Sequence, residues 1–409
     1  MKANRILLCM LPLASMLLFS SCDRIMSALS GDGVQETETW LDIPLEKRLE
    51  LDEKYEYVGE LSCGLAYVML NDKYGYIDID GNEVIPCIYD NARTFKEGLA
   101  AVKINERWGY IDETGKEVIP FVYNGILGEK CDFKDGFAVV EQDERYGIID
   151  KTGEALVPTI YSNAFAFSDG LALVSIGSRY SFIDKTGKEA FPLNYDAASP
   201  FAEGLARVEL NGKYGFIDTE GKLVVPCIYE NAYSFEDGRA AAKLNGLWGY
   251  IDLSGKNVVP HRYDYCSSYS SGYASVDADG KSGIIDKSGK VVAPFNYDFC
   301  GDVIEGLAVM ERGGKMGYLD CNGKEIISPR YDANSLYMVF GLHDFTRGIA
   351  SVLVDEKWGA VDKSGTEIVR AVYDDLHVKE HLGIIDAMLE NPDGTTTVHR
   401  YDFNGNFLR

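Results

Sequence analysis

Short motifs that mark common enzyme classes are missing from this sequence of 409 residues. It contains no His-Glu-x-x-His, no Gly-x-Ser-x-Gly and no phosphate-binding glycine loop. Histidine is scarce: there are five, and none precedes His261. His377 and His381 would share one face of a helix, but no third ligand accompanies them, and zinc needs three or four. We therefore expect no enzymatic activity, no metal site and no cofactor.

Cysteine is present, but not in a pattern that indicates a metal or redox site. The nine cysteines include no Cys-x-x-Cys. Cys266 and Cys300 stand where other units of the chain have alanine, as expected of small buried positions. The alternative is a disulfide between them in an oxidising compartment, because the two positions are equivalent in adjacent units.

Positive charge is in deficit, with 40 basic against 64 acidic residues and a net charge of −24. Nucleic acid phosphates repel such a polyanion, so we expect no nucleic acid partner. An anionic membrane surface repels it as well, and attachment to a membrane would need a lipid anchor. The acidic surface favours a soluble monomer.

Repetition is what the sequence has in abundance. The motif Asp-x-x-Gly occurs ten times in one register, with successive gaps of 34, 38, 34, 34, 34, 34, 34, 42 and 40 residues. A fixed period of this size indicates a repeat architecture. The ten aspartates are Asp78, Asp112, Asp150, Asp184, Asp218, Asp252, Asp286, Asp320, Asp362 and Asp402.

The segment from Gly98 to Tyr123 shows what one unit contains. Three short runs rich in valine, isoleucine and aromatic residues are separated by turn residues, which is typical of strands. One turn is Asn-Gly in two units and suits a two-residue hairpin. The other is the repeated motif, in which Asp112 can accept hydrogen bonds from amides two or three residues on and Gly115 can take a left-handed conformation. Each unit is therefore predicted to be a three-stranded antiparallel meander.

Three further positions recur in the units. Glycine follows the aromatic residue of the second strand, at Gly109, Gly249 and Gly359, where a side chain should collide with a neighbouring strand. Proline stands eight residues after the aspartate in seven units and is expected to end the third strand. Tyrosine, as at Tyr123, stands eleven residues after the aspartate in all nine complete units.

The fold class that follows is all-β, a tandem array of about ten such meanders with a 34-residue period. The units could stack as an open, solenoid-like array or close into a β-propeller-like ring. Propellers usually have four to eight blades of four strands. The sequence also stops within the third strand of its last unit, with no complementary half-unit at its start. We therefore predict the open array, with the closed ring as the alternative.

This pattern resembles the WG-repeat family of bacterial proteins. The resemblance covers roughly residues 57–409 and departs locally, for example where Ser181 replaces the glycine and where Ser282 and Met316 replace the aromatic residue. It implies β-repeats in a bacterial envelope or extracellular protein. The matching residues are Arg107-Trp108-Gly109-Tyr110-Ile111-Asp112, Pro120, Tyr89-Asp90 and Glu97-Gly98-Leu99-Ala100.

Two repeated features have a functional and a structural interpretation. Trp108, Trp248 and Trp358, with their tyrosine equivalents, could stack sugars, but such ladders more often form the core of a repeat. The turn aspartates, such as Asp252 and Asp362, could hold calcium only if units shared a site, because one carboxylate is too few for six to eight oxygen ligands. An aspartate that caps its own turn explains the motif without an ion. We favour the structural interpretation of both.

The start of the chain has the features of an export signal. A positive beginning and an apolar run over 6–19 are followed by Ser20-Ser21-Cys22, and the run is too short to span a membrane comfortably. The ending resembles a bacterial lipobox, which implies lipidation of Cys22 and an envelope location, at the outer membrane or cell surface of a Gram-negative-type bacterium. Ordinary cleavage beside an incidental cysteine is the alternative. We assign residues 1–21 to the signal peptide, 22–56 to an acidic tether and 57–409 to the repeats.

Two insertions are the best functional hint in the repeats. Four residues are added between Tyr123 and Gly136, and eight between Tyr331 and Gly348. Both fall in the same connection of the unit, and insertions gathered on one side often mark a binding face. The second insertion is either an interaction patch or a lid over the last units, and its apolar candidates are Leu336, Tyr337, Met338 and Phe340.

Together these features predict a lipid-anchored, non-enzymatic envelope scaffold that binds a protein or another macromolecule. A glycan-binding module is the alternative. A hydrolase with its active site in the C-terminal units is a third hypothesis.

Overall fold

The structure is a computed structural model that describes residues 39–125, 128–333 and 344–409. The chain divides into two units, 1–35 and 36–409, and all described residues lie in the second. The helices among them are η1 (Trp40–Asp42), α2 (Leu45–Lys54) and η2 (Gly128–Cys131). None of the helices in this part of the chain has the length and apolar character needed to cross a membrane.

The described strands form ten small antiparallel sheets, each of three or four strands in sequence order, which we number as blades 1 to 10. Blades 1 to 3 consist of β1 (Tyr57–Val58), β2 (Leu65–Leu70), β3 (Lys73–Asp78) and β4 (Glu83–Tyr89); β5 (Asn91–Ala92), β6 (Leu99–Ile104), β7 (Arg107–Asp112) and β8 (Glu117–Tyr123); β9 (Phe137–Gln142), β10 (Arg145–Asp150) and β11 (Ala155–Tyr161). Blades 4 to 6 consist of β12 (Asn163–Ala164), β13 (Leu171–Ile176), β14 (Arg179–Asp184) and β15 (Glu189–Phe191); β16 (Ala197–Ala202), β17 (Leu205–Leu210), β18 (Lys213–Asp218) and β19 (Leu223–Tyr229); β20 (Asn231–Ala232), β21 (Arg239–Leu244), β22 (Leu247–Asp252) and β23 (Asn257–Tyr263). Blades 7 to 10 consist of β24 (Tyr265–Cys266), β25 (Tyr273–Ala278), β26 (Lys281–Asp286) and β27 (Val291–Tyr297); β28 (Phe299–Ile304), β29 (Leu307–Arg312), β30 (Lys315–Asp320) and β31 (Glu325–Asp332); β32 (Ile349–Val354), β33 (Lys357–Asp362) and β34 (Glu367–Tyr373); β35 (Asp375–Lys379), β36 (Ile384–Glu390) and β37 (Thr396–Asp402).

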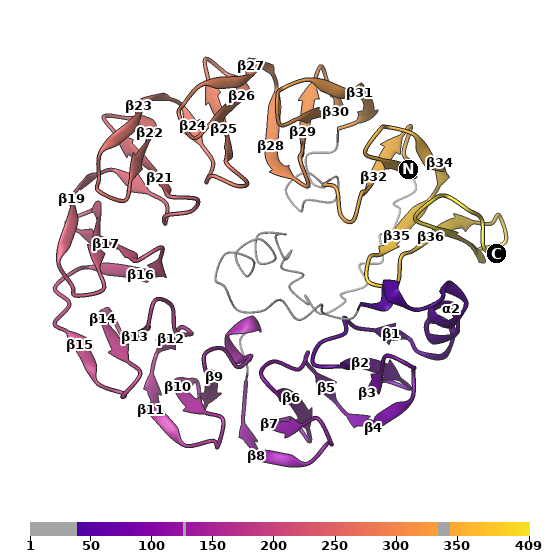
Figure 1. Cartoon of the computed structure of the whole chain (residues 1–409), viewed down its shortest axis with the longest axis horizontal. Helices are drawn as coiled ribbons and strands as arrows, with labels where there is room; N and C mark the ends of the chain where they lie inside the picture. Colours follow the sequence, from indigo (N-terminus) through magenta and orange to yellow (C-terminus); the bar gives the residue numbers. More distant parts are fainter. Residues whose placement is uncertain (1–38, 126–127, 334–343) are drawn as a thin grey trace, which may run out of the picture. The chain divides into compact units, whose positions relative to one another are not determined.

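The ten sheets of this unit are arranged as a ten-bladed β-propeller (Figure 1). The all-β class and the antiparallel meanders are confirmed. Of the two predicted arrangements, the open array is wrong and the closed ring is the one that the structure has. Each blade packs on the next through a hydrophobic cluster, such as the one that joins Tyr250 of blade 6 to Val276 of blade 7.

Closure of the ring depends on a segment that the sequence analysis assigns to the tether. Residues 40–55 form η1 and α2, and Trp40, Leu51 and Tyr55 pack in one buried cluster with Leu382 and Ile384 of blade 10. The end of the tether, from 39 to 56, therefore belongs to the folded unit. The same cluster contains Val58, Ala66, Val68 and Ile77 of blade 1, so blade 1 and this segment together pack against blade 10.

A buried ion-pair network reinforces this closure. Asp52 of α2 lies 2.5 Å from the ammonium of Lys379 and 2.6 Å from the guanidinium of Arg400. Asp386 of β36 accepts from the same two cations, at 2.9 and 2.8 Å. Two carboxylates and two cations thus neutralise one another where the first helix meets the last blade, which is the arrangement that buried charge requires.

Each blade follows the predicted meander with two corrections, in the number of strands and in the position of the proline. Seven of the ten described sheets have four strands rather than the predicted three. In blade 6 the hairpin between β21 and β22 has Asn245 and Gly246 at φ of 53° and 82°, as a two-residue Asn-Gly turn requires. Pro260, however, lies inside β23 rather than at its end. β23 is the outermost strand of its sheet, so the missing N–H of proline costs no ladder bond there.

Candidate binding site

The tryptophans of the repeat are core residues and do not form an exposed platform. Trp108 is 9% exposed and Trp248 is 5% exposed, and both belong to hydrophobic clusters. Trp358 is partly buried and packs on the cluster shared by blades 9 and 10. Their position explains the burial, because each pairs across the sheet with the repeat tyrosine, as Trp108 does with Tyr123.

The glycine after each tryptophan permits a close approach of two strands. A Cβ atom placed on Gly249 would lie 2.6 Å from the carbonyl oxygen of Val259 and 2.8 Å from the amide nitrogen of His261. Gly109 and Gly359 have the same environment, with outer-strand backbone atoms at 2.7 Å. A side chain at these positions must push the outer strand away.

The repeated aspartate caps its own turn. Oδ1 of Asp112 accepts from the amides of Thr114 and Lys116 at 2.9 and 3.1 Å, that is, two and four residues on. Gly115, at φ of 81°, donates its amide to the Asp112 carbonyl. The hydrogen bond from the Thr114 hydroxyl, at 2.6 Å, is the main cause that lowers the pKa of Asp112. Asp252 and Asp362 make equivalent bonds, and no group of three or more His, Cys, Asp or Glu in the described ranges is placed to hold a metal ion.

Two acidic positions of the repeat join neighbouring blades, a role that the sequence analysis missed. Glu97 of blade 2 accepts from the amides of Asp135 and Gly136 in blade 3 at 2.8 and 3.0 Å. Asp298, which follows the tyrosine of blade 7, accepts from Lys281 at 2.5 Å and from the amide of Gly313 in blade 8 at 2.7 Å. The Glu-Gly and Tyr-Asp dipeptides, which recur at constant spacing in the sequence, could have indicated these contacts between blades. The basic residue that begins the second long strand, such as Lys281, forms an ion pair with the carboxylate.

The remaining candidate residues do not form a site in the described structure. His377 lies in strand β35, not in a helix, so it does not share a face with His381 as the helical spacing would require. Cys266 and Cys300 are free buried thiols in two different hydrophobic clusters. Cys22 lies outside the described residues, as do Leu336, Tyr337, Met338 and Phe340.

The first insertion occupies the position of the innermost strand of blade 3. Its helix η2 lies toward the centre of the ring (Figure 1). Asp132, next to η2, binds Arg93 of blade 2 through two contacts of 2.9 and 3.2 Å. Cys131 is fully buried in the cluster between blades 2 and 3. The described part of this insertion therefore packs between blades.

Blade 4 is where the repeat is broken. Ser181 replaces the glycine of the second long strand, and Phe191 replaces the small or branched residue that is buried in the other blades. The outer strand β15 has only 3 residues and pairs with β14 only at Phe182–Phe191 and Ile183–Glu189. The pair that would join Tyr180 to Tyr195, equivalent to Trp248–Tyr263 in blade 6, is absent from this described sheet.

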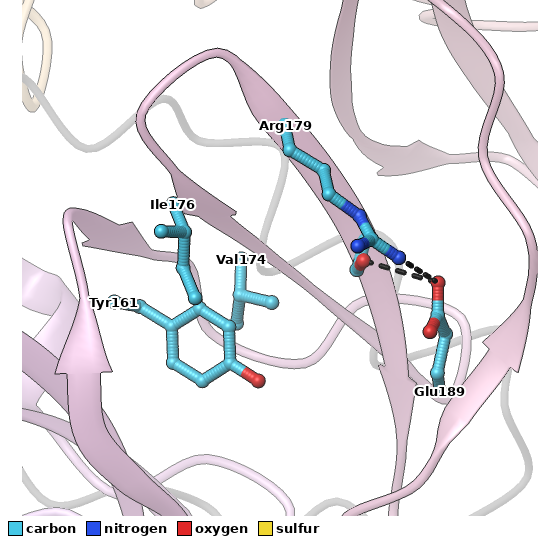
Figure 2. A pocket seen from close by; sticks show the side chains of 6 residues that line it. Tyr161, Val174, Ile176, Arg179 and Glu189 are labelled. Atoms are coloured by element: carbon cyan, nitrogen blue, oxygen red, sulfur yellow. Dashed lines mark hydrogen bonds and ion pairs between the residues drawn. The ribbon is translucent and has the colours of Figure 1, made fainter.

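A pocket of about 210 Å³ lies where the outer strand has left blade 4. Figure 2 shows that the apolar side chains of Tyr161, Val174 and Ile176 face the polar side chains of Arg179 and Glu189 across it. The Ser181 hydroxyl donates to Glu189 at 3.2 Å, and the Arg179 guanidinium lies 3.9 Å from the same carboxylate.

Tyrosine burial shows the same disturbance. Seven of the nine repeat tyrosines are 1 to 8% exposed, from Tyr89 at 5% to Tyr331 at 1%. The two that are only partly buried are Tyr161, which ends blade 3, and Tyr195, the tyrosine of the blade 4 repeat. The broken repeat therefore exposes aromatic surface that the rest of the ring covers. Ser181 was noted in the sequence as a departure, but only together with Phe191 does it indicate a site.

Comparison with known families agrees with this repeat structure. The WG containing repeat matches ten consecutive segments that cover most of the chain: 54–74, 74–108, 108–146, 146–180, 180–214, 214–248, 248–281, 283–315, 316–358 and 358–378. The chain belongs to the WG containing repeat family. A WG-repeat propeller is a repeat scaffold or binding module, and the residues described above are those on which its packing depends.

Solved structures resemble this WG-repeat protein only distantly. The crystal structure of the eukaryotic initiation factor is 10% identical, with 83% of this chain and 93% of that chain covered and a TM-score of 0.46. The dihydro-heme d1 dehydrogenase NirN in complex with DHE is 15% identical, with coverage of 69% and 75% and a TM-score of 0.30. Hsv2p of Kluyveromyces lactis is 10% identical, with coverage of 64% and 92% and a TM-score of 0.30. No curated protein matches the chain.

Proposed function

We propose that this WG-repeat propeller is a non-catalytic binding protein that holds a protein partner at blade 4 and is anchored by lipid in a bacterial envelope. One observation carries the binding site. The repeat positions elsewhere serve packing, capping and blade-to-blade contacts. Among the blades as the structure describes them, blade 4 combines a serine for glycine, a shortened outer strand and a pocket. Functional sites are expected where a protein departs from its own structural pattern.

A non-catalytic role is supported by the composition of the pocket. Its polar side chains are Arg179, Ser181 and Glu189, and the serine donates to the glutamate without a histidine among the lining residues. A serine nucleophile needs a base that is itself oriented by a third group. A partner that is a protein rather than a glycan is supported by the burial of Trp108 and Trp248, because rings that stack sugars must be exposed.

Recovery of a partner from envelope extracts tests the binding function. We expect the immobilised protein to retain at least one envelope protein that the variant Ser181→Gly/Phe191→Val, designed to close blade 4, does not retain. A matched control is Arg145→Ala in blade 3, at an exposed position equivalent to Arg179, and it should retain the partner. Failure of the wild-type protein to retain any envelope protein would refute the proposal.

The lipid anchor rests on the residues before the described structure. We expect Cys22→Ser to move the protein from the membrane fraction to the soluble envelope fraction, or to accumulate with residues 1–21 attached. The propeller should stay folded, because its first described element is η1 at Trp40. Normal cleavage together with full membrane retention of the variant would show that Cys22 is not the anchor.

A further inference from the structure

The intact blades show what the open side of blade 4 is shaped to receive. In three complete blades, the outer strand covers the tyrosine of the preceding blade with the ring of the side chain nine residues after the turn aspartate. Phe121 stacks on Tyr89 at 6.5 Å between ring centres, and Phe295 stacks on Tyr263 at 5.9 Å. His261 stacks on Tyr229 in the same way, at 5.9 Å.

The outer strand of an intact blade makes a second contact three residues further along. Its aspartate pairs with the basic residue that begins the preceding strand, as Asp298 does with Lys281 at 2.5 Å. Three other blades have the same pair: Lys73–Asp90, Lys315–Asp332 and Lys357–Asp374. Blade 7 makes both contacts: its outer strand brings the ring of Phe295 and the carboxylate of Asp298, three positions apart, to these two places.

At blade 4, a tyrosine and a basic residue stand at the two places that would receive these contacts, but neither contact is made in the described structure. Tyr161 is partly exposed at the pocket, where Leu193 is the equivalent of Phe295. Arg179 is the equivalent of Lys281, yet its side chain is 76% exposed and lies 3.9 Å from Glu189. Asp196, which would be its partner, keeps the contact to the next blade that Asp298 also makes, accepting from the amide of Asn211 at 2.6 Å, but it forms no ion pair with Arg179 in the described structure. The edge of β14 beside Tyr180 is also unpaired on its outer side in this described sheet.

We infer that blade 4 binds an extended segment of a partner protein that carries an aromatic residue followed, three positions later, by an acidic residue. The segment adds to β14 at the part of its outer edge beside Tyr180 that β15 leaves unpaired, its ring lies over Tyr161, and its carboxylate pairs with Arg179. Strand addition to an exposed edge uses main-chain hydrogen bonds for affinity and side-chain pockets for specificity. This inference rests on the proposed function and deepens it by giving the chemistry of the partner.

The chain's own N-terminal segment does not have this chemistry. Residues 23–38 contain no aromatic residue. A second copy of the chain has such sequences, but in the intact blades they are already paired within the sheet, as Tyr297 is with Ser282. A partner with an unpaired segment therefore fits better than either of these occupants.

Binding of a defined peptide tests the inference. The probe is a fluorescently labelled peptide that copies residues 289–298, Gly-Lys-Val-Val-Ala-Pro-Phe-Asn-Tyr-Asp, and fluorescence anisotropy follows its binding to the full chain. We expect saturable binding, about tenfold weaker for the peptide with Phe295→Ala, since one buried ring contributes more than the roughly 1.4 kcal/mol that tenfold requires. Arg179→Ala in the protein should weaken binding severalfold, and the control Arg145→Ala should not.

Several outcomes would overturn it. These are the absence of saturable binding, equal binding of the Phe295→Ala peptide, or equal effects of Arg179→Ala and Arg145→Ala. Tighter peptide binding after deletion of residues 23–38 would make the chain's own segment the occupant. A dimer in sedimentation that Ser181→Gly/Phe191→Val abolishes would make it a second copy. Peptide binding without an envelope partner would leave the site standing and refute the proposed function. A partner retained by the closed variant would show that the protein binds it outside blade 4, which would overturn this inference and the blade 4 part of the proposed function.

Discussion

Blades 4 and 6 come from repeats of the same length, and only one of them is complete. In both, proline and tyrosine stand eight and eleven residues after the turn aspartate. The outer strand β23 of blade 6 has 7 residues and pairs to its last tyrosine, whereas β15 of blade 4 has 3. Neither repeat has an insertion relative to the other, so the difference between the two blades comes from their side chains.

Two substitutions explain the difference. In blade 6, a Cβ atom on Gly249 would lie only 2.6 Å from the carbonyl oxygen of Val259, so the close approach of the two strands needs glycine. In blade 4 the equivalent residue is Ser181, which has a Cβ atom. Val259 is fully buried, while the larger Phe191 at the equivalent position is only partly buried. Crowding at one backbone contact and one core position is therefore enough to release a strand. A repeat protein can create a pocket in this way without changing its length.

The largest expected effect is that of Gly249→Val, which should disrupt blade 6. The new side chain would collide with backbone rather than with a movable side chain, so we expect a loss of about 3 kcal/mol in unfolding free energy. Chemical denaturation followed by tryptophan fluorescence, with Trp248 in the affected blade, measures it. Ser181→Val is the matched control and should cost less than about 1 kcal/mol, because blade 4 already accommodates a Cβ. Equal losses would show that the glycine does not set the strand contact.

The reverse change should close blade 4. With Ser181→Gly/Phe191→Val we expect slower amide exchange over 192–195, burial of Tyr161 and Tyr195, and a gain of up to about 1 kcal/mol from the restored strand pairing. Hydrogen exchange and ultraviolet absorption of tyrosine measure these changes. Phe191→Val alone is the control, since the serine Cβ would still keep the strands apart. Unchanged exchange at 192–195 in the double variant would mean that another residue holds blade 4 open.

The sequence predicted the repeating unit well because each of its signals is local. The Asn-Gly turn at Asn245, the self-capping Asp112 and the close approach at Gly109 depend on residues within one meander. Ring closure depends on contacts between distant parts, such as Asp52 with Arg400, which no periodicity reveals. The array was therefore predicted to be open although its units were described correctly.

The candidate site was missed for a related reason. Insertions attract attention in a repeat, yet the described part of the first one, at Asp132, packs against Arg93 of its neighbour. The pocket arises instead from Ser181 and Phe191, ten residues apart in sequence and on adjacent strands. Neither is unusual alone. Their joint effect appears only when the distance between the two strand backbones is known.

The smallest expected effect concerns a feature that the two blades share. Asp184 of blade 4 and Asp252 of blade 6 cap their turns alike, and hydrogen bonds from Thr186 and Ser254 hold the pKa of each carboxyl below its usual value. A carboxyl with a lowered pKa in the folded state stabilises the protein above its unfolded pKa of about 3.9. That stabilisation is lost as the pH falls through the lower, folded value. Both blades should therefore lose it together, in acid below about pH 4.

Replacing each aspartate in turn sharpens the comparison. Asp184→Asn and Asp252→Asn keep an acceptor oxygen but remove the titrating group. Each should lower the melting temperature only slightly at pH 7 and should flatten its fall between pH 5 and 3 by the same amount. Melting curves at a series of pH values measure this. A larger effect at Asp184 would mean that its turn helps to hold blade 4 open, whereas equal effects would confine the cause to the strand contact at Ser181 and the core position at Phe191.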